Sequence, residues 1–366
     1  MKISLVLCSD MHMDIDRANS LMETHKNHEW VSNYKLADVI VIMTCAFGLK
    51  KHSSMFVIAE ILQNAKPDST VIATGCLAKL NKTELEAIPN LEVKSLEEVS
   101  AMLAILPSST SPQEVHTMHQ NIVIISNGCL RKCSYCVYSL IEDKYTSKPM
   151  ENILSEVEKL SRTESIIYLT GAHETSDYGI DLYGSRSFST LIEQACTNFP
   201  SIDFGIGWFN PDGLTDDVID VMKRLKNIVH IMLHLQHNDN NILRQMHRTP
   251  FEITEGKIKK LHSAIPDLKI STEVIVGFPG ETDESFNGLV RFLEESRDIF
   301  YDIGVASYEP VIGTKAATLP NLPSPAIRQK RMEFIEKRFN ATAFPAPEDF
   351  KPVLSSYFDA CQFFNN

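Results

Sequence analysis

The sequence of 366 residues lacks any apolar run of about 18 residues, the length that a helix needs to cross a bilayer. Its first residues, Met-Lys-Ile-Ser-Leu-Val-Leu-Cys-Ser-Asp, form a short apolar stretch that meets an acidic residue at once. A secretory signal would have a longer apolar core and a small-residue cleavage site. We therefore expect a cytoplasmic protein with no membrane segment.

Positive charge is also scarce. The chain has 35 Lys and Arg against 47 Asp and Glu, a net charge of -12, so the molecule as a whole repels polyanions. The densest basic run lies at residues 328–338, but Glu333 and Glu336 interrupt it at helical spacing, which is typical of a solvated helix face. The charge therefore argues against a nucleic acid partner.

Cysteine, by contrast, is well represented, with eight residues. Disulfides are rare in a reducing compartment, so metal ligation is the better explanation. Cys129, Cys133 and Cys136 have C-x3-C-x2-C spacing, and three thiolates in place of four leave one iron of an iron–sulfur cluster open to another ligand. The alternative is a zinc loop or three buried free cysteines, although no second Cys or Cys/His couple follows.

Residues 1–106 are predicted to form a small parallel α/β domain. Its predicted strands are residues 3–7, 38–44 and 70–74, and its predicted helices include 53–63 and 97–106. Cys8, Cys45 and Cys76 each follow one strand, and an open parallel sheet brings such strand ends to one edge. We therefore predict a second metal site on these cysteines, although a single cysteine in this position is usually a small buried apolar residue.

The rest of the chain predicts a second, larger α/β domain. Residues 107–120 are rich in Pro, Ser and Thr and predict a linker. Between residues 121 and 339 six strands are predicted, at 122–126, 166–170, 203–208, 229–235, 269–276 and 303–308, with helices between them. Such a pattern predicts a parallel sheet curled into a partial (β/α)6 barrel, with the three-cysteine loop after its first strand, at the edge where barrels carry their chemistry. Residues 340–366 predict a short irregular tail.

Several segments resemble the radical SAM methylthiotransferase family, and their order and spacing are more specific than any one of them. The three-cysteine loop, with Tyr135 before its last cysteine, resembles the radical SAM superfamily, and Met43-Thr-Cys45 resembles the family's Asn-Thr-Cys strand end. Further matching segments are residues 74–78, 169–171, 178–181, 242–248, 271–282 and 312–317. The resemblance covers nearly the whole chain to about Pro320.

This resemblance implies S-adenosylmethionine and two [4Fe-4S] clusters as cofactors. The cluster on Cys129, Cys133 and Cys136 would cleave S-adenosylmethionine to a 5'-deoxyadenosyl radical. An auxiliary cluster would carry the sulfur to be inserted, and its implied ligands are Cys8, Cys45 and Cys76. The implied activity is methylthiolation of an unactivated C–H bond, with electrons from a reducing partner such as flavodoxin or ferredoxin.

Four residues of the barrel are the candidates for binding S-adenosylmethionine: Tyr135, Gly171, Gln236 and Glu273. Gly171 would let the backbone approach the methionine end of the ligand, and Gln236 and Glu273, at the ends of later strands, would supply polar contacts. Gly171 could equally be a turn glycine and Glu273 a surface strand residue.

The sequence also departs from the family. Family members carry a C-terminal TRAM β-barrel that grips the macromolecular substrate, but residues 340–366, 27 in all, lack five short alternating strands. With the acidic charge, this favours a peptide, protein or small-molecule substrate. The alternatives are a transfer RNA methylthiotransferase, radical insertion of sulfur without methylation, and a non-catalytic cluster-binding scaffold.

Two histidines stand where the family has none. The family's Pro-hydrophobic-Gln-Ser-Gly-Ser turn reads His234-Leu-Gln-His237-Asn-Asp here. Because histidine titrates near neutrality, we predict that at least one of them contacts substrate or moves a proton. The alternative is that both are hydrogen-bonded packing residues.

Overall fold

The computed structural model describes residues 1–8, 12–46, 50–107, 121–141 and 144–344. The chain divides into two compact units with the boundary between Gln120 and Asn121, and each unit is described by itself. Nearly all of the predicted linker and most of the predicted tail lie outside the described residues. None of the helices within these ranges is long and apolar enough to cross a membrane.

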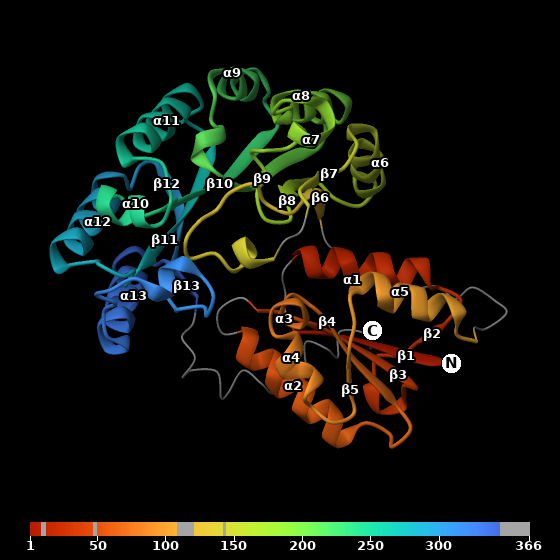
Figure 1. Ribbon diagram of the computed structural model, residues 1–366. Coiled ribbons are helices and arrows are strands. Elements are labelled where there is room, and N and C mark those ends of the chain that lie inside the picture. The colour runs from red at the N-terminus through yellow and green to blue at the C-terminus, as the bar shows by residue number, and fades with distance from the viewer. Residues whose placement is uncertain (9–11, 47–49, 108–120, 142–143, 345–366) are drawn as a thin grey trace. The chain divides into compact units, whose positions relative to one another are not determined.

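The first unit is built on a five-stranded parallel sheet in the order β2-β1-β3-β4-β5 (Figure 1). Its strands are β1 (Lys2–Leu7), β2 (Glu29–Trp30), β3 (Val39–Thr44), β4 (Thr70–Gly75) and β5 (Leu91–Val93). Its helices are α1 (His12–Thr24), α2 (Lys50–Asn64), α3 (Cys76–Leu80), α4 (Lys82–Glu86) and α5 (Leu96–Ile105), with a 3-10 turn at Tyr34–Leu36. The three predicted strands and two predicted helices are confirmed within a few residues.

Helices cover both faces of this sheet. The central strand β3 reads Val-Ile-Val-Ile-Met-Thr and is buried over its whole length, as β-branched residues between two helical layers should be. Leu21 of α1 and Val99 and Leu103 of α5 pack on one face, and α2 lies on the opposite face (Figure 1). The carboxyl ends of β1, β3 and β4 therefore stand side by side at one edge.

The second unit is an eight-stranded open sheet in the order β13-β12-β11-β10-β9-β8-β6-β7. Its strands are β6 (Ile122–Asn127), β7 (Thr146–Ser147), β8 (Ile166–Gly171), β9 (Asp203–Phe209), β10 (Ile228–Gln236), β11 (Lys269–Val276), β12 (Phe300–Ser307) and β13 (Thr342–Phe344). All pairs are parallel except β6 with β7. The six predicted strands correspond to β6 and β8–β12, so the predicted parallel sheet of a partial barrel is confirmed.

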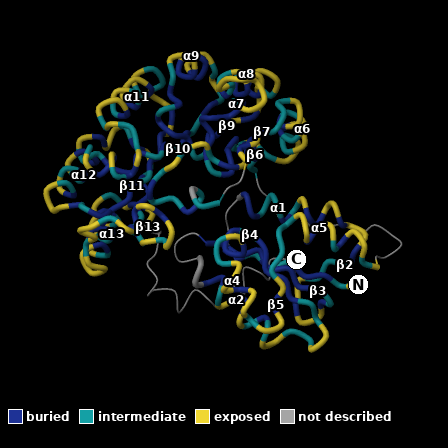
Figure 2. Tube along the Cα trace, viewed as in Figure 1, coloured by how far each residue is buried: buried dark blue, intermediate teal, exposed yellow. Residues whose placement is uncertain are grey.

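The helices of this unit form the outer layer of the curved sheet (Figure 1). They are α6 (Met150–Leu160), α7 (Ile180–Tyr183), α8 (Phe188–Asn198), α9 (Asp216–Arg224), α10 (Asn240–Gln245), α11 (Phe251–Ala264), α12 (Asp283–Glu295) and α13 (Pro325–Phe339). Short 3-10 turns occur at Val137–Leu140, Pro211–Gly213 and Lys315–Thr318. Figure 2 shows that the strands are mainly buried and that the helices expose their outer sides.

One expectation needs correction. Residues 342–344 were predicted to belong to an irregular tail, but they form β13, which pairs in parallel with β12 at Gly304, Val305 and Ala306. A three-residue strand is too short to show an alternating pattern in the sequence, and its pairing depends on the edge that β12 leaves open. The rest of the predicted tail, from residue 345, lies outside the described residues.

Ile206 of β9 tests the packing of the second core. Its side chain is fully buried within the main apolar cluster. Replacement by Ala should lower the free energy of unfolding by about 2–5 kcal/mol, because it removes apolar contacts and leaves a cavity. Urea unfolding measures the change, and Ile312→Ala, at an 89% exposed position, is the control. Equal unfolding curves for Ile206→Ala and the wild type would contradict this packing.

Candidate active site and cluster-binding loops

The three-cysteine loop begins directly after β6. Gly128 separates the strand from Cys129 and has a φ of +79°, which glycine adopts without strain. Cys129, Cys133 and Cys136 are half-buried and none forms a disulfide. Burial raises the pKa of the Cys129 thiol to about 11, partly offset by a backbone hydrogen bond from Arg131. Metal binding at this cysteine would therefore displace a proton.

Later parts of the second unit hold this loop in place. The Ser134 N–H donates to the Met246 carbonyl over 3.2 Å, and the Ala316 N–H donates to the Ser134 carbonyl over 2.9 Å. The His247 ring Nδ1 lies 2.9 Å from the Lys132 carbonyl and donates to it. The loop is therefore attached to the segments that follow β10 and β12.

The other three cysteines lie at one edge of the first sheet. Cys8, Cys45 and Cys76 directly follow β1, β3 and β4, which are neighbours in the sheet, and all three are buried. Burial, together with nearby Asp14 and Cys45, raises the pKa of the Cys76 thiol to about 12. The structure thus brings the three predicted strand ends together.

The two cysteine sets differ from the site of a single metal ion. In the described residues, no three His, Cys, Asp or Glu side chains are arranged to hold one metal ion. A [4Fe-4S] cluster requires a different arrangement of ligands, because each cysteine binds a different iron and the sulfurs need not converge on one point. Two sets of three cysteines that form no disulfide fit that requirement, and the ligand assignment remains a prediction.

Gly171 ends β8 where the chain folds tightly back on itself. A Cβ atom there would lie 2.0 Å from the Glu174 carbonyl oxygen and 2.8 Å from the Ser126 Oγ. The Gly171 N–H donates to the Thr175 Oγ1 over 2.8 Å. The turn at residues 171–175 therefore requires a glycine at position 171. A role of Gly171 in ligand binding remains a prediction.

Gln236 ends β10, whereas Glu273, which was expected at a strand end, lies within β11 because that strand continues to Val276. The Gln236 side chain hydrogen-bonds the Glu273 carboxylate, while burial raises the pKa of Glu273. Gln236 has a φ of +71° and is 4% exposed. Its Oε1 is buried and has no hydrogen-bond partner within the described part of the chain. An unpaired acceptor of this kind fits a ligand that brings a hydrogen-bond donor.

Two neighbours complete this part of the site. Tyr135, on the cysteine loop, packs edge-on against Phe278, with ring centroids 6.4 Å apart. Arg248 donates to the His234 carbonyl and also hydrogen-bonds the Cys133 side chain. Sequence reasoning included Arg248 in a matching segment and gave it no role, and no local pattern in the sequence indicates these contacts.

The two histidines have different environments. The Nδ1 of His234 is buried and has no hydrogen-bond partner in the described residues. Burial and the charges of Arg248 and Arg131 lower the pKa of His234 to about 3, so its ring is neutral near pH 7. A neutral imidazole can accept a proton, and its predicted role stays open.

His237 is fully buried and fully bonded. The Asp239 N–H donates to Nδ1 over 2.9 Å, so Nε2 carries the ring proton and donates to Glu281 over 3.3 Å. Glu281 also binds Arg331 at 2.7 Å. These contacts favour the packing alternative for His237 over a direct role in chemistry.

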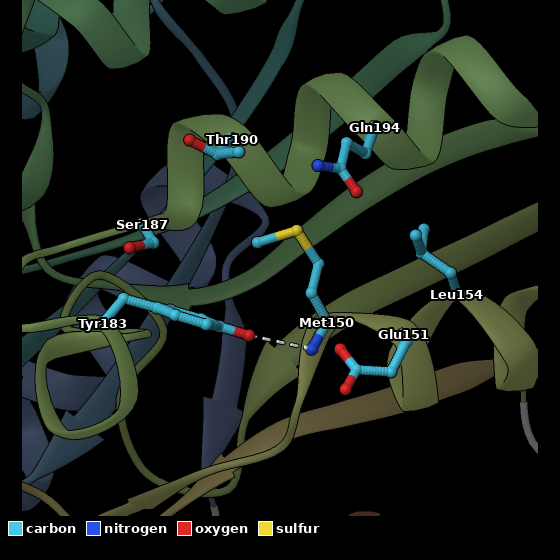
Figure 3. A pocket seen from close by; sticks show the side chains of 7 residues that line it. All are labelled: Met150, Glu151, Leu154, Tyr183, Ser187, Thr190 and Gln194. Carbon is cyan, nitrogen blue, oxygen red and sulfur yellow. Dashed lines mark hydrogen bonds between the residues drawn. The ribbon is translucent and has the colours of Figure 1, made fainter.

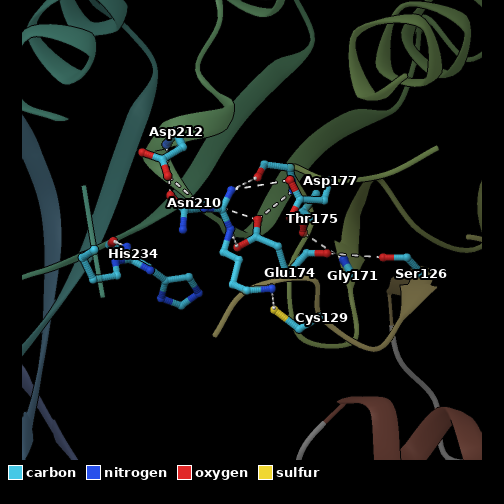
Figure 4. A network of polar contacts seen from close by, with 12 residues as sticks. Ser126, Cys129, Gly171, Glu174, Thr175, Asp177, Asn210, Asp212 and His234 are labelled. Carbon is cyan, nitrogen blue, oxygen red and sulfur yellow. Dashed lines mark hydrogen bonds and ion pairs between the residues drawn. The ribbon is translucent and has the colours of Figure 1, made fainter. Parts of the chain in front are cut away.

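Sequence reasoning missed an ionic network in which Arg131 contacts three carboxylates. Figure 4 labels these carboxylates, Glu174, Asp177 and Asp212. The Nη1 of Arg131 lies 2.8 Å from Asp212, its Nη2 lies 3.5 Å from Asp177, and its Nε lies 3.4 Å from Glu174. Glu174 in turn accepts hydrogen bonds from the backbone N–H of Ser176 and Asn210. The available signal was a set of acidic residues just beyond the ends of two barrel strands.

The pocket drawn in Figure 3 lies elsewhere, in the helical layer. It has a volume of about 450 Å³ and is lined by Met150, Glu151, Leu154, Tyr183, Ser187, Thr190 and Gln194. These residues come from α6, the end of α7, and α8 with Ser187 just before it. The pocket includes none of the cysteines and none of the predicted S-adenosylmethionine contacts.

Comparison with known proteins agrees with this geometry. Residues 123–293 match the Radical SAM superfamily and residues 2–96 match an uncharacterised protein family, UPF0004. The chain is 31% identical over 345 residues to the ribosomal protein uS12 methylthiotransferase RimO of Clostridioides difficile (strain 630), covering 86% of this chain and 76% of that protein. The RimO of Desulforamulus reducens is 32% identical over 339 residues, covering 83% and 74%.

A solved structure shares the fold. TsrM from Kitasatospora setae, a radical S-adenosylmethionine methyltransferase with cobalamin and a [4Fe-4S] cluster bound, superposes with a TM-score of 0.62 at 13% identity, over 86% of this chain and 74% of that one. The partial barrel and its cysteine loop thus define a radical SAM enzyme. The similarity to RimO along both units shows that the chain belongs to the radical SAM methylthiotransferase family, whose cofactors are S-adenosylmethionine and [4Fe-4S] clusters.

Replacing Gly171 by Ala tests the tight turn after β8. The added Cβ would collide with the Glu174 carbonyl, so we expect a loss of about 1–3 kcal/mol in the free energy of unfolding. Gly288→Ala in α12, where an added Cβ meets nothing within 4 Å, should instead add about 0.5–1 kcal/mol. Urea unfolding compares the two, and similar behaviour of both variants would refute the turn geometry.

His234→Gln tests the buried neutral imidazole. Unfolded histidine has a pKa of about 6.5, and the folded pKa is about 3, so protonation of the unfolded chain costs stability as the pH falls below the unfolded value. Between the unfolded pKa and the folded pKa, His234 should therefore lower the free energy of unfolding by about 1.4 kcal/mol for each unit that the pH falls. The variant should lose less stability between about pH 7 and pH 5.5. Parallel urea curves at both pH values for variant and wild type would show that His234 titrates normally.

Proposed function

We propose that this protein inserts sulfur as a methylthio group at an unactivated C–H bond of a protein or peptide substrate. The observation that carries the proposal is the pair of cysteine sets, one in each unit: Cys8, Cys45 and Cys76 follow three neighbouring strands, and the other three lie on the loop after β6. A single three-thiol site would support radical formation alone. The second set supplies a place for the sulfur to be inserted.

Each cysteine set has its own task in this proposal. Cys129, Cys133 and Cys136 would hold one [4Fe-4S] cluster, and the auxiliary cluster would be held by Cys8, Cys45 and Cys76. When bound, the clusters supply the electron that cleaves S-adenosylmethionine and the sulfur that is transferred. The chain itself supplies thiolates, orientation and a buried environment.

Residues at the strand ends of the barrel would orient S-adenosylmethionine. The unpaired Gln236 Oε1 is a ready acceptor for the ligand's amino group, and Glu273, fixed by Gln236, lies beside it. Gly171 would keep the backbone turn close, and Tyr135 would pack beside the cysteine loop. Of the two histidines, His234 remains the candidate for contact with substrate, because His237 is fully engaged by its neighbours.

The substrate class follows from the relatives and from charge. The relatives are named for acting on ribosomal protein uS12, and a net charge of -12 disfavours transfer RNA. We therefore propose a protein or peptide substrate encountered in the cytoplasm, and a flavodoxin or ferredoxin as the electron donor.

Two triple variants test the two-cluster assignment. In Cys129/Cys133/Cys136→Ala and in Cys8/Cys45/Cys76→Ala, iron and sulfide per chain should each fall to about half of the reconstituted wild type, because one cluster remains. The first variant should form no 5'-deoxyadenosine from S-adenosylmethionine. The second should still form it but yield no sulfur-containing product by mass spectrometry.

Other outcomes would redirect or end the proposal. A product that gains one sulfur without a methyl group would favour sulfur insertion alone. A wild-type protein that is fully loaded with iron, is reduced, and still makes no 5'-deoxyadenosine would identify a cluster-binding scaffold. Loss of methylthio-nucleosides from transfer RNA on deletion of the gene would restore transfer RNA as the substrate.

A further inference from the structure

We propose that Arg131 is a positioning residue that holds the first half of the three-cysteine loop in its cluster-binding conformation. The inference rests on the proposed function, in which Cys129, Cys133 and Cys136 bind a cluster. Arg131 lies between the first two of these cysteines, and its side chain is 18% exposed. Its role is separate from binding the cluster or S-adenosylmethionine directly.

The two halves of the loop are held in different ways. The second half has backbone hydrogen bonds through Ser134 to Met246 and Ala316. The first half is held through side chains, by the guanidinium of Arg131 and by the ring of His247, which bonds the Lys132 carbonyl. The conformation around Cys129 therefore depends strongly on these side-chain contacts.

Arg131 connects this half of the loop to two other loops. Glu174 and Asp177 belong to the segment after β8, and Asp212 belongs to the 3-10 turn after β9. Figure 4 shows these three carboxylates within one network. A planar guanidinium with five N–H donors can contact all three at once, which a lysine ammonium cannot reproduce.

The carboxylates are themselves fixed in place. Glu174 is 3% exposed and accepts backbone hydrogen bonds from Ser176 at 2.8 Å and Asn210 at 3.1 Å. Asp177 is also 3% exposed and is held by Arg186 at 2.8 Å. Because these partners are rigid, they define where the guanidinium, and with it the backbone of Arg131, must lie.

The backbone of Arg131 is coupled directly to the first cysteine. Its N–H lies 3.4 Å from the Cys129 Sγ and donates to it. Such a donor stabilises the thiolate that an iron ligand must become, and it orients the sulfur. Fixing the Arg131 side chain therefore also fixes the direction of the Cys129 side chain.

The primary experiment compares three variants of the full-length chain after reconstitution with iron and sulfide. Arg131→Gln should release iron from the barrel cluster to a chelator at least about tenfold faster than the wild type, because the loop loses a charge-assisted anchor. Arg131→Lys keeps the positive charge but loses the planar guanidinium with its several N–H donors, so its rate of iron release should be intermediate. Lys132→Gln removes a positive charge from an exposed neighbour in the same loop and should match the wild type.

A second readout needs neither a cluster nor activity. In the metal-free full-length chain, Cys129 should be alkylated at least about tenfold faster in Arg131→Gln, since the first half of the loop opens more often, and Cys133 and Cys136 should change less. Peptide mass spectrometry separates these cysteines from Cys8, Cys45 and Cys76, whose rates should not change. This readout remains informative if the wild type proves to have no methylthiotransferase activity.

A variant with a smaller change keeps the test informative if Arg131→Gln fails to fold. Asp212→Asn weakens one contact at a carboxylate that is 28% exposed and leaves Glu174 and Asp177 in place, so it should give a smaller change in the same direction. Unchanged iron release and unchanged alkylation in both Arg131→Gln and Asp212→Asn would overturn the proposal. Equal effects of Lys132→Gln and Arg131→Gln would also overturn it, because the charge alone would then suffice.

Discussion

Parallel strand pairing is the constraint on which both cysteine sites depend. In a parallel sheet every strand ends at the same edge, so residues far apart in the sequence become neighbours when they follow adjacent strands. Cys8, Cys45 and Cys76 are separated by thirty or more residues at each step, yet β1, β3 and β4 lie side by side. The same constraint places the cysteine loop after β6 at the edge where β8 and β9 also end.

Ion pairs of partly or fully buried side chains then fix how the loops lie at this edge of the second sheet. Arg131 meets three carboxylates, and Arg331 meets Glu281, which also binds His237. Leaving one member of such a buried pair without its partner costs about 3–5 kcal/mol, so each network tolerates few arrangements. The Gln236 Oε1 is one of several buried polar atoms with no hydrogen-bond partner in the described residues, and its role in binding S-adenosylmethionine remains a proposal.

Much of the architecture was predictable because it is encoded locally. Runs such as Val-Ile-Val-Ile-Met-Thr identify buried strands, and the spacing of strands and helices predicts parallel pairing. Contacts between distant loops leave no such pattern. His237 has the sequence environment of a site residue, yet both of its ring nitrogens are engaged by Asp239 and Glu281. Arg131 was visible in the cysteine loop, but its three partners lie beyond two other strands.

The sequence by itself determined the two sets of cysteines and the succession of the main strands and helices, because these depend on spacing within short segments and on alternation along the chain. Its resemblance to a known family indicated the enzyme class. Only the tertiary structure decided which polar side chains meet: Arg131 with Glu174, Asp177 and Asp212, Gln236 with Glu273, and the short strand β13 with β12. These contacts depend on where separate loops lie after the sheet has formed, and no local pattern of residues specifies that.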